Sequence, residues 1–139
     1  MPAEARTESE AGVEAFVRYY VELINRASRT LDAAPLREFS NGCADCERIA
    51  TDYENDKAAG YLYEGGQITI TSYEYVTVGT QQGASFLIDS SPLTIVYGDG
   101  RPVDGLAFPA TTGLASAAEV RWDDSRSSWV MAQFLLGQA

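Results

Sequence analysis

The sequence predicts an α+β fold in which three N-terminal helices, one long and two short, pack on a bent antiparallel sheet. Apolar residues recur every three or four positions over residues 13–27, which is typical of an amphipathic helix. After Gly60 the chain becomes rich in Val, Ile, Thr and Tyr, which favours strands. Helices followed by strands indicate separate layers around one core. The chain has 139 residues, and we expect a flexible spacer over residues 1–6 and a single domain over residues 7–139.

The long helix has the clearest signals. Thr7 and Glu10 have the spacing of a capping box, which predicts a helix start at that point. Acidic residues lie near the start and arginines near the end, as the helix dipole favours. The expected buried stripe consists of Val13, Phe16, Val17, Tyr20, Ile24 and Ala27.

Two shorter helices are expected next. Residues 33–39 form the first, with Pro35 suited to an opening turn. Residues 40–42 break the chain, and the second begins near Cys43 with Cys46, Ile49, Ala50 and Tyr53 on one face. Gly60 is suited to end it.

The strands follow from β-branched and aromatic segments. Residues 68–78 form one strand, with a bulge or bend near residues 72–74 where the alternation slips. Residues 84–88 and 93–97 form either one strand interrupted at Pro92 or two strands. Residues 64–66 read as a turn and residues 98–113 as a long loop. Residues 117–122 and 129–135 pair as a hairpin.

Charge and composition exclude several classes of function. The net charge is −10, which disfavours nucleic acids and anionic membranes as partners. The chain has no histidine, which excludes a Ser-His-Asp triad and a His-ligated zinc site. The acidic positions 52, 54 and 56 lack the Gly and Glu that a calcium loop requires, because Lys57 and Tyr63 stand there. We expect no metal and no cofactor.

Cys43 and Cys46 are the only cysteines and form a C-x-x-C pair. A thioredoxin-like site needs a strand before the helix, and zinc needs four ligands. The sequence provides neither the preceding strand nor the four ligands, so we expect a structural disulfide rather than a redox or metal site. A structural disulfide indicates an oxidising compartment and therefore export.

The aromatic side chains are the candidate pocket lining. A helix over a curved sheet can enclose a hollow, and tyrosines line such hollows with a polar tip. The alternative for each is ordinary core packing. Among the carboxylates, Glu74, Asp89 and Glu119 lie in strand-like segments, but no spacing singles out a catalytic residue. The candidate lining residues are Phe16, Tyr19, Tyr20, Tyr53, Tyr73, Tyr75, Trp122 and Trp129.

Three stretches together resemble a known family. They are residues 14–27, residues 35–40 with Cys43 and Cys46, and residues 120–124 with Trp129 and Val130. The set resembles an uncharacterised family of actinobacterial lipoproteins and secreted proteins that carry a domain of unknown function. Its layout is similar to the NTF2-like, or cystatin-like cone, fold. The resemblance covers nearly the whole chain from Thr7.

The resemblance implies an export signal and a lipid-bearing cysteine, neither of which is present in this chain, followed by a flexible spacer ahead of the domain. We therefore expect an extracytoplasmic protein, lipid-anchored or secreted, that meets a membrane only through that anchor. The family brings no catalytic residues. Steroid-isomerase-like members of the wider fold use a Tyr and an Asp, and Tyr19 or Tyr20 lies in a comparable place without an alignable Asp. Fold analogy of this kind is associational.

Three functions remain open, and the first is preferred. It is a non-enzymatic binding module of the cell envelope that recognises a protein, a peptide or a cell-wall partner. The second is a carrier or sensor that holds a small hydrophobic ligand in the cone, and the third is an isomerase-like enzyme. A filled interior with an exposed apolar surface would favour the first, and an internal pocket the second. A homodimer through the open sheet face is also expected.

Overall fold

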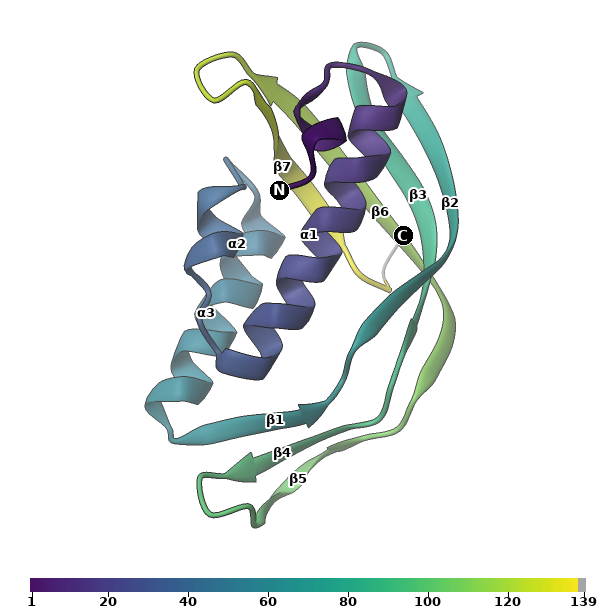
Figure 1. Cartoon of the computed structure of the whole chain (residues 1–139). Coiled ribbons are helices and arrows are strands. Elements are labelled where there is room, and N and C mark those ends of the chain that lie inside the picture. Colours follow the sequence, from purple (N-terminus) through teal and green to yellow (C-terminus); the bar gives the residue numbers. More distant parts are fainter. Residues whose placement is uncertain (138–139) are drawn as a thin grey trace.

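The computed structural model describes residues 1–137 and confirms the predicted α+β class. Three α-helices cover one side of a strongly curved antiparallel sheet, as Figure 1 shows. The sheet has a four-stranded section and a three-stranded section. The largest side chains of the core lie between the helices and the four-stranded section.

Residues 1–6 differ from the expected flexible spacer. Ala3–Arg6 forms a short 3₁₀ helix, η1, and Ala5 is completely buried. The segment packs against the first α-helix and the last strand. A single buried alanine leaves no periodic pattern, so composition alone did not reveal this element.

The first helix, α1, spans Glu10–Thr30 and buries all six residues of the predicted stripe. Its start differs from the predicted capping box. Ser9 is the N-cap, and its hydroxyl accepts a hydrogen bond from the backbone N–H of Gly12 at 3.0 Å. The Thr7 hydroxyl instead donates to the carbonyl of Glu4 at 2.7 Å, which closes η1. The nearby 3₁₀ turn thus moves the cap by two residues.

The short helices α2 (Ala34–Glu38) and α3 (Ala44–Ala58) lie beside α1. Cys43 is the N-cap of α3 and forms the expected disulfide with Cys46, with a Cα–Cα distance of 5.2 Å. Both cysteines are buried in the core. Arg37 of α2 forms ion pairs with Glu47 and Glu54 of α3 and so ties the two helices together.

We expect Cys46→Ser to lower the free energy of unfolding by about 2 kcal/mol, because the disulfide closes a very short loop in the unfolded chain. The variant should still fold, since α1 and the sheet supply most of the core. Urea denaturation with and without reductant measures the effect: reductant should destabilise the native chain and leave the variant unchanged. A loss of all structure would contradict this limited role.

Seven strands follow the helices. The four-stranded section has the order β2-β3-β6-β7, and the three-stranded section has the order β1-β4-β5. All pairings are antiparallel. The strands are β1 (Tyr61–Gly65), β2 (Ile68–Val78), β3 (Gln81–Ser90), β4 (Leu93–Tyr97), β5 (Pro102–Phe108), β6 (Thr111–Asp123) and β7 (Ser128–Leu135).

The two sections of the sheet are joined at a sharp bend. At the bend, Gly66 donates its N–H to the carbonyl of Pro92 at 3.0 Å, and Ser91 donates to the carbonyl of Gln67 at 3.0 Å. Gly65 has a φ of +81°, and a Cβ there would lie 2.0 Å from the Pro92 oxygen. Only glycine permits so close an approach in this backbone conformation.

The sheet confirms some predicted strands and corrects others. β2, the separate β3 and β4, and the β6–β7 hairpin agree with the prediction, and the bulge of β2 lies between Ile70 and Ser72. Two strands were not predicted: only the end of β1, residues 64–65, was assigned, as part of a turn, and β5 was assigned to a loop. Both are short, and β5 contains Pro102 and Gly105, which local preference disfavours in strands. Pairing with β4 overrides that preference.

Candidate functional site

Three of the aromatic residues predicted to line a pocket are instead part of the packed core. Phe16, Tyr20 and Trp129 are at most 1 % exposed. Tyr20 contacts Phe134 edge to face, with 5.1 Å between ring centroids, and its hydroxyl donates to the carbonyl of Leu36 at 2.9 Å. Packing of this kind occupies the concave side of the sheet, where a carrier's ligand would lie.

The other five predicted residues are partly buried and scattered around that core. Tyr19 packs edge to face on Phe39, and Tyr53 packs on Tyr63. The Arg18 guanidinium lies over the Tyr73 ring, and the Tyr75 hydroxyl donates to Gln82 at 2.8 Å. Trp122 packs on Trp129 with 5.3 Å between ring centroids. Of the eight, Trp122 and Trp129 line one of the hollows described next.

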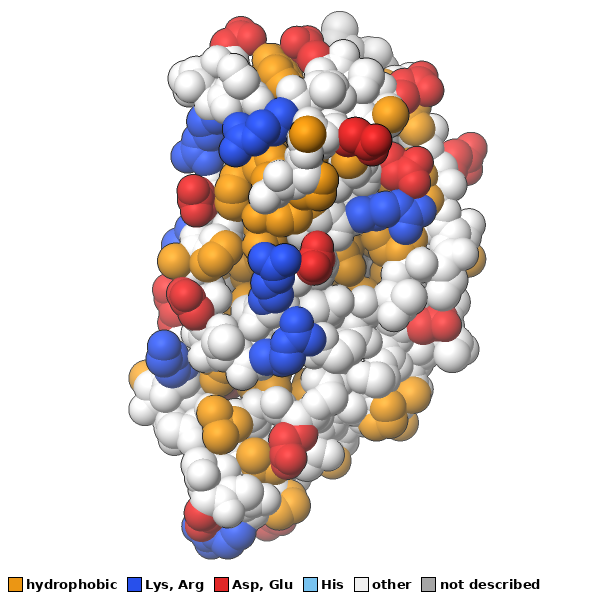
Figure 2. Space-filling model, in the orientation of Figure 1, with side chains coloured by type: hydrophobic (Ala, Val, Ile, Leu, Met, Phe, Trp, Pro, Cys, Tyr) orange, Lys and Arg blue, Asp and Glu red, His pale blue; other side chains and the backbone are white. Residues whose placement is uncertain are grey.

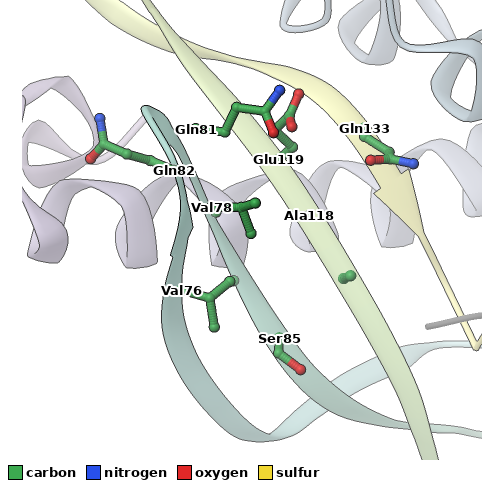
Figure 3. Close-up of a pocket in the computed structure, with 11 residues that line it drawn as sticks. Val76, Val78, Gln81, Gln82, Ser85, Ala118, Glu119 and Gln133 are labelled. Atoms are coloured by element: carbon green, nitrogen blue, oxygen red, sulfur yellow. The ribbon is translucent and has the colours of Figure 1, made fainter.

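A hollow of about 260 Å³ lies on the sheet surface that faces away from the helices (Figure 3). It crosses strands β2, β3, β6 and β7. Val76 and Val78 form one apolar side, and Val78 is 72 % exposed. Glu119 is the one charged residue among its lining. The remaining lining residues are Gln81, Gln82, Gly83, Ala84, Ser85, Ala117, Ala118 and Gln133.

A second hollow of about 380 Å³ adjoins the first and shares Gln81, Gln82 and Glu119 with it. Its other walls include Val120 and the Trp122–Trp129 pair, which belong to the helix-side core, so this second hollow lies at the end of the sheet. We call the first hollow, on the outer sheet face, the outer trough. Its valine end is apolar, and Glu119 lies where the two hollows meet.

Small side chains on the outward positions of the central strands form the floor of the trough. Gly83 pairs with Glu119, and Ser85 pairs with Ala117. A Cβ at Gly83 would lie 2.0 Å from the Ala118 carbonyl oxygen, so the two strands approach closely there. The sequence carries this signal as runs of small residues at 83–85 and 115–118.

The three strand carboxylates singled out from the sequence have different surroundings. Glu74 is exposed on β2. Asp89 accepts the backbone N–H of Gly113 at 2.9 Å, which joins β3 to β6 beside their register shift. Glu119 alone lines the trough. The structure thus places only one of them in a surface hollow.

Burial raises the pKa of several tyrosines. It raises the pKa of Tyr53 to about 12, and it raises the pKa values of Tyr20, Tyr63 and Tyr73 still further. The Asp56 carboxylate, which accepts a hydrogen bond from Tyr63, adds to the effect there. A group whose pKa is higher in the folded than in the unfolded state makes its full contribution to stability at pH values below its unfolded pKa. That contribution is lost as the pH rises toward the folded pKa.

We therefore expect the free energy of unfolding to fall once the pH exceeds the unfolded tyrosine pKa of about 10. The slope is at most about 1.4 kcal/mol per pH unit for each such tyrosine. Urea denaturation at several values between pH 8 and 12 measures it. Tyr53→Phe removes one titrating group and should make the slope shallower, so an equal slope in both proteins would contradict this account.

The fold and site define a small α+β domain with a packed interior and a hollowed outer sheet face. Residues 1–134 match the family of unknown function DUF6318, and the chain belongs to that family. No curated protein matches it.

Among solved structures, the chain is similar to the intermembrane space region of the chloroplast protein ARC6. The TM-score is 0.65 at 14 % sequence identity, and the match covers 94 % of this chain and 97 % of the other. At that identity the similarity shows a shared fold only. Within residues 1–137, no helix has both the length and the apolar character needed to cross a bilayer.

Proposed function

We propose that this chain is a non-enzymatic, extracytoplasmic binding module that holds an extended basic peptide segment in its outer trough. The observation that supports this function best is the contrast between the two sides of the sheet. The helix side is filled by large aromatic side chains, whereas the opposite side presents an open apolar hollow with one carboxylate. Shallow sheet surfaces of this kind suit a peptide better than a small molecule.

The trough fits a basic peptide with small aliphatic side chains. The valines and the alanine and glycine floor would contact an aliphatic side chain, and burial of such a group is favourable. Glu119 would pair with a neighbouring Lys or Arg, and the amides of Gln81 and Gln133 offer hydrogen bonds to a peptide backbone. The net charge of −10 would also raise the association rate of a cationic partner.

The positions of Tyr19 and Tyr20 on α1 support the proposal that the chain is not an enzyme. An isomerase-like site needs a tyrosine hydroxyl in contact with substrate. The Tyr20 hydroxyl is bound to the Leu36 carbonyl in the core, and Tyr19 packs on Phe39. Neither residue lines the outer trough.

The buried Cys43–Cys46 disulfide supports an extracytoplasmic location, because such bonds persist in oxidising compartments. Together with the sequence resemblance, the disulfide favours an exported actinobacterial protein with an NTF2-like fold, either lipid-anchored or secreted. Counting free thiols in protein purified from its native cell tests the location: two free thiols would overturn it.

Isothermal titration with end-blocked Lys-Val-Lys-Val-Lys tests the binding function. We expect a Kd of about 100 µM, as for a small and shallow contact, and much weaker binding of Glu-Val-Glu-Val-Glu. Ser85→Trp should abolish binding by filling the trough, and Glu119→Lys should weaken it about tenfold. Ser125→Trp, in the exposed β6–β7 turn and outside the lining of the outer trough, is the matched control.

Equal affinity for the two peptides, or no effect of Ser85→Trp, would overturn the proposal. A small hydrophobic molecule retained through purification and seen by native mass spectrometry would instead support the carrier function.

A further inference from the structure

The two outer edges of the four-stranded section differ in how they are protected. At β7, the Met131 N–H donates to the carbonyl of Phe39 at 2.8 Å, and the Asn41 N–H donates to the carbonyl of Met131 at 3.0 Å. The link between α2 and α3 therefore covers that edge. At the opposite edge, β2 pairs with β3 alone, and Figure 1 shows no element of residues 1–137 beyond it.

The free edge of β2 is long and carries few of the features that normally prevent pairing. It has eleven residues, with Glu74 as the one charged residue and no lysine or proline. Only its beginning is capped: the Asn25 side chain donates to the carbonyl of Ile68 at 2.9 Å and accepts its N–H at 2.8 Å. Exposed edges of this length are templates for another strand.

The neighbouring face of α1 carries alternating charges, which we call the charge ladder: Glu14, Arg18, Glu22 and Arg26. Glu14 pairs with Arg18 at 2.9 Å and Glu22 with Arg26 at 3.1 Å, and all four side chains are about half exposed. A hollow of about 240 Å³ lies between this helix face and β2, lined in part by Arg18, Glu22 and Ile70. Charged side chains of both signs are visible along this side in Figure 2.

The ladder and the strand are aligned with each other. Asn25 contacts the start of β2 at Ile68, whereas Arg18 lies over Tyr73 near the middle of the strand. The helix and strand thus run in opposite directions, and the midpoint of the ladder, between Arg18 and Glu22, lies close to the midpoint of β2.

A ladder with this order of charges is complementary to itself under a two-fold rotation. When two copies run antiparallel, Glu14 faces Arg26 of the second copy, and Arg18 faces Glu22 of the second copy, twice each. The same rotation pairs β2 with β2 in the antiparallel sense, and an axis near Tyr73 places Glu74 opposite Ser72 rather than opposite itself. A strand pair and four opposite-charge contacts are then formed by a single isologous interface.

We propose that two copies of this chain pair through the free edge of β2 to form a dimer with a continuous eight-stranded sheet. The partner at the edge is a second copy of the chain because the charge ladder is complementary to itself. Binding of a different protein would not require this self-complementarity. This dimer differs from the sheet-face dimer expected from the sequence, and it leaves the outer trough open to solvent. It also does not depend on the proposed peptide binding.

A charge-swap cycle followed by sedimentation velocity tests the dimer. Arg18→Glu and Glu22→Arg each place like charges opposite one another at two symmetric contacts, and each should weaken dimerisation about tenfold. The double variant Arg18→Glu with Glu22→Arg restores opposite charges across the interface and should return the dissociation constant to within about threefold of the native value. Arg48→Glu, on α3, changes the net charge by the same amount as Arg18→Glu and is the control for that variant.

Cysteine crosslinking locates the interface independently of charge. The double variant Ser72→Cys with Glu74→Cys places each new cysteine opposite its counterpart in the second copy and should give a covalent dimer under mild oxidation, whereas Ser85→Cys on the outer sheet face should not. Crosslinking through Ser85→Cys alone would overturn the edge dimer in favour of a sheet-face dimer. A native chain that is monomeric at about 1 mM, or a double variant no better than the single ones, would overturn it as well.

Discussion

We expect Trp129→Ala to lower the free energy of unfolding by about 4 kcal/mol, because the variant leaves a large cavity in a well-packed core. Trp129 is 1 % exposed and packs edge to face on Trp122. Its indole N–H also donates to the carbonyl of Thr7 at 2.9 Å, which ties η1 to β7. A loss of this size is a large part of the total stability of an ordinary domain. Urea denaturation followed by circular dichroism measures it.

Trp129→Phe is the matched control, since it keeps an aromatic ring and removes the hydrogen bond. We expect a smaller loss of stability, together with faster hydrogen exchange in residues 1–9, whose contact with β7 would be weakened. An equal loss in both variants would show that the hydrogen bond, rather than the ring volume, stabilises this end of the domain. A loss below about 1 kcal/mol for Trp129→Ala would contradict the packed-core account.

Tyr20→Ala should cost a similar amount, about 4 kcal/mol, for the same reason. Tyr20 lies at the centre of the contacts among α1, α2 and β7, where it touches Phe16 and Phe134 and binds the Leu36 carbonyl. Its removal should therefore loosen α2 from α1 as well as leave a cavity. Thermal and urea unfolding of the purified variant provide the measurement.

Tyr20→Phe separates the hydroxyl from the ring. It leaves the Leu36 carbonyl without its partner in the core, which should cost about 1–2 kcal/mol. If the phenylalanine variant were as unstable as the alanine variant, the hydrogen bond would be the main contribution. If both were as stable as the native chain, Tyr20 would face a hollow rather than the core, and the carrier function would regain support.

The sequence predicted the elements whose signals are local and repeated. The stripe of α1 spans four turns, and Phe16, Tyr20 and Ile24 are buried as expected. The hairpin of β6 and β7 and the Cys43–Cys46 disulfide also agree with the structure. In each case several residues within a short segment carry the same information.

The missed elements depend on contacts between distant segments. η1 is held by α1 and β7, and β1 and β5 are held by β4, so their own residues show little preference. The N-cap is Ser9 rather than Thr7 because η1 occupies Thr7. Similarly, the spacing of the aromatics showed that they point inward, but whether an inward side chain meets a hollow or a neighbour depends on the whole core.

The outer trough was not predicted for a related reason. Its floor depends on the register that brings Gly83 beside Glu119 and Ser85 beside Ala117. Small residues in a strand are individually weak signals, and only their pairing across two strands produces a hollow. The sequence indicated only that Glu119 is a strand carboxylate, and the register of the strands places it in the lining of the trough.

The proposal that the outer sheet face is the binding surface is tested most directly by an NMR titration. ¹⁵N-labelled protein would be titrated with end-blocked Lys-Val-Lys-Val-Lys, and shifts of the backbone amides would be mapped. The account predicts saturating shifts at Gln81, Gly83, Ser85, Glu119 and Gln133, with none at Tyr20 or Phe16 in the core. Shifts confined to the helices or core, or no saturating shifts at any residue, would contradict it.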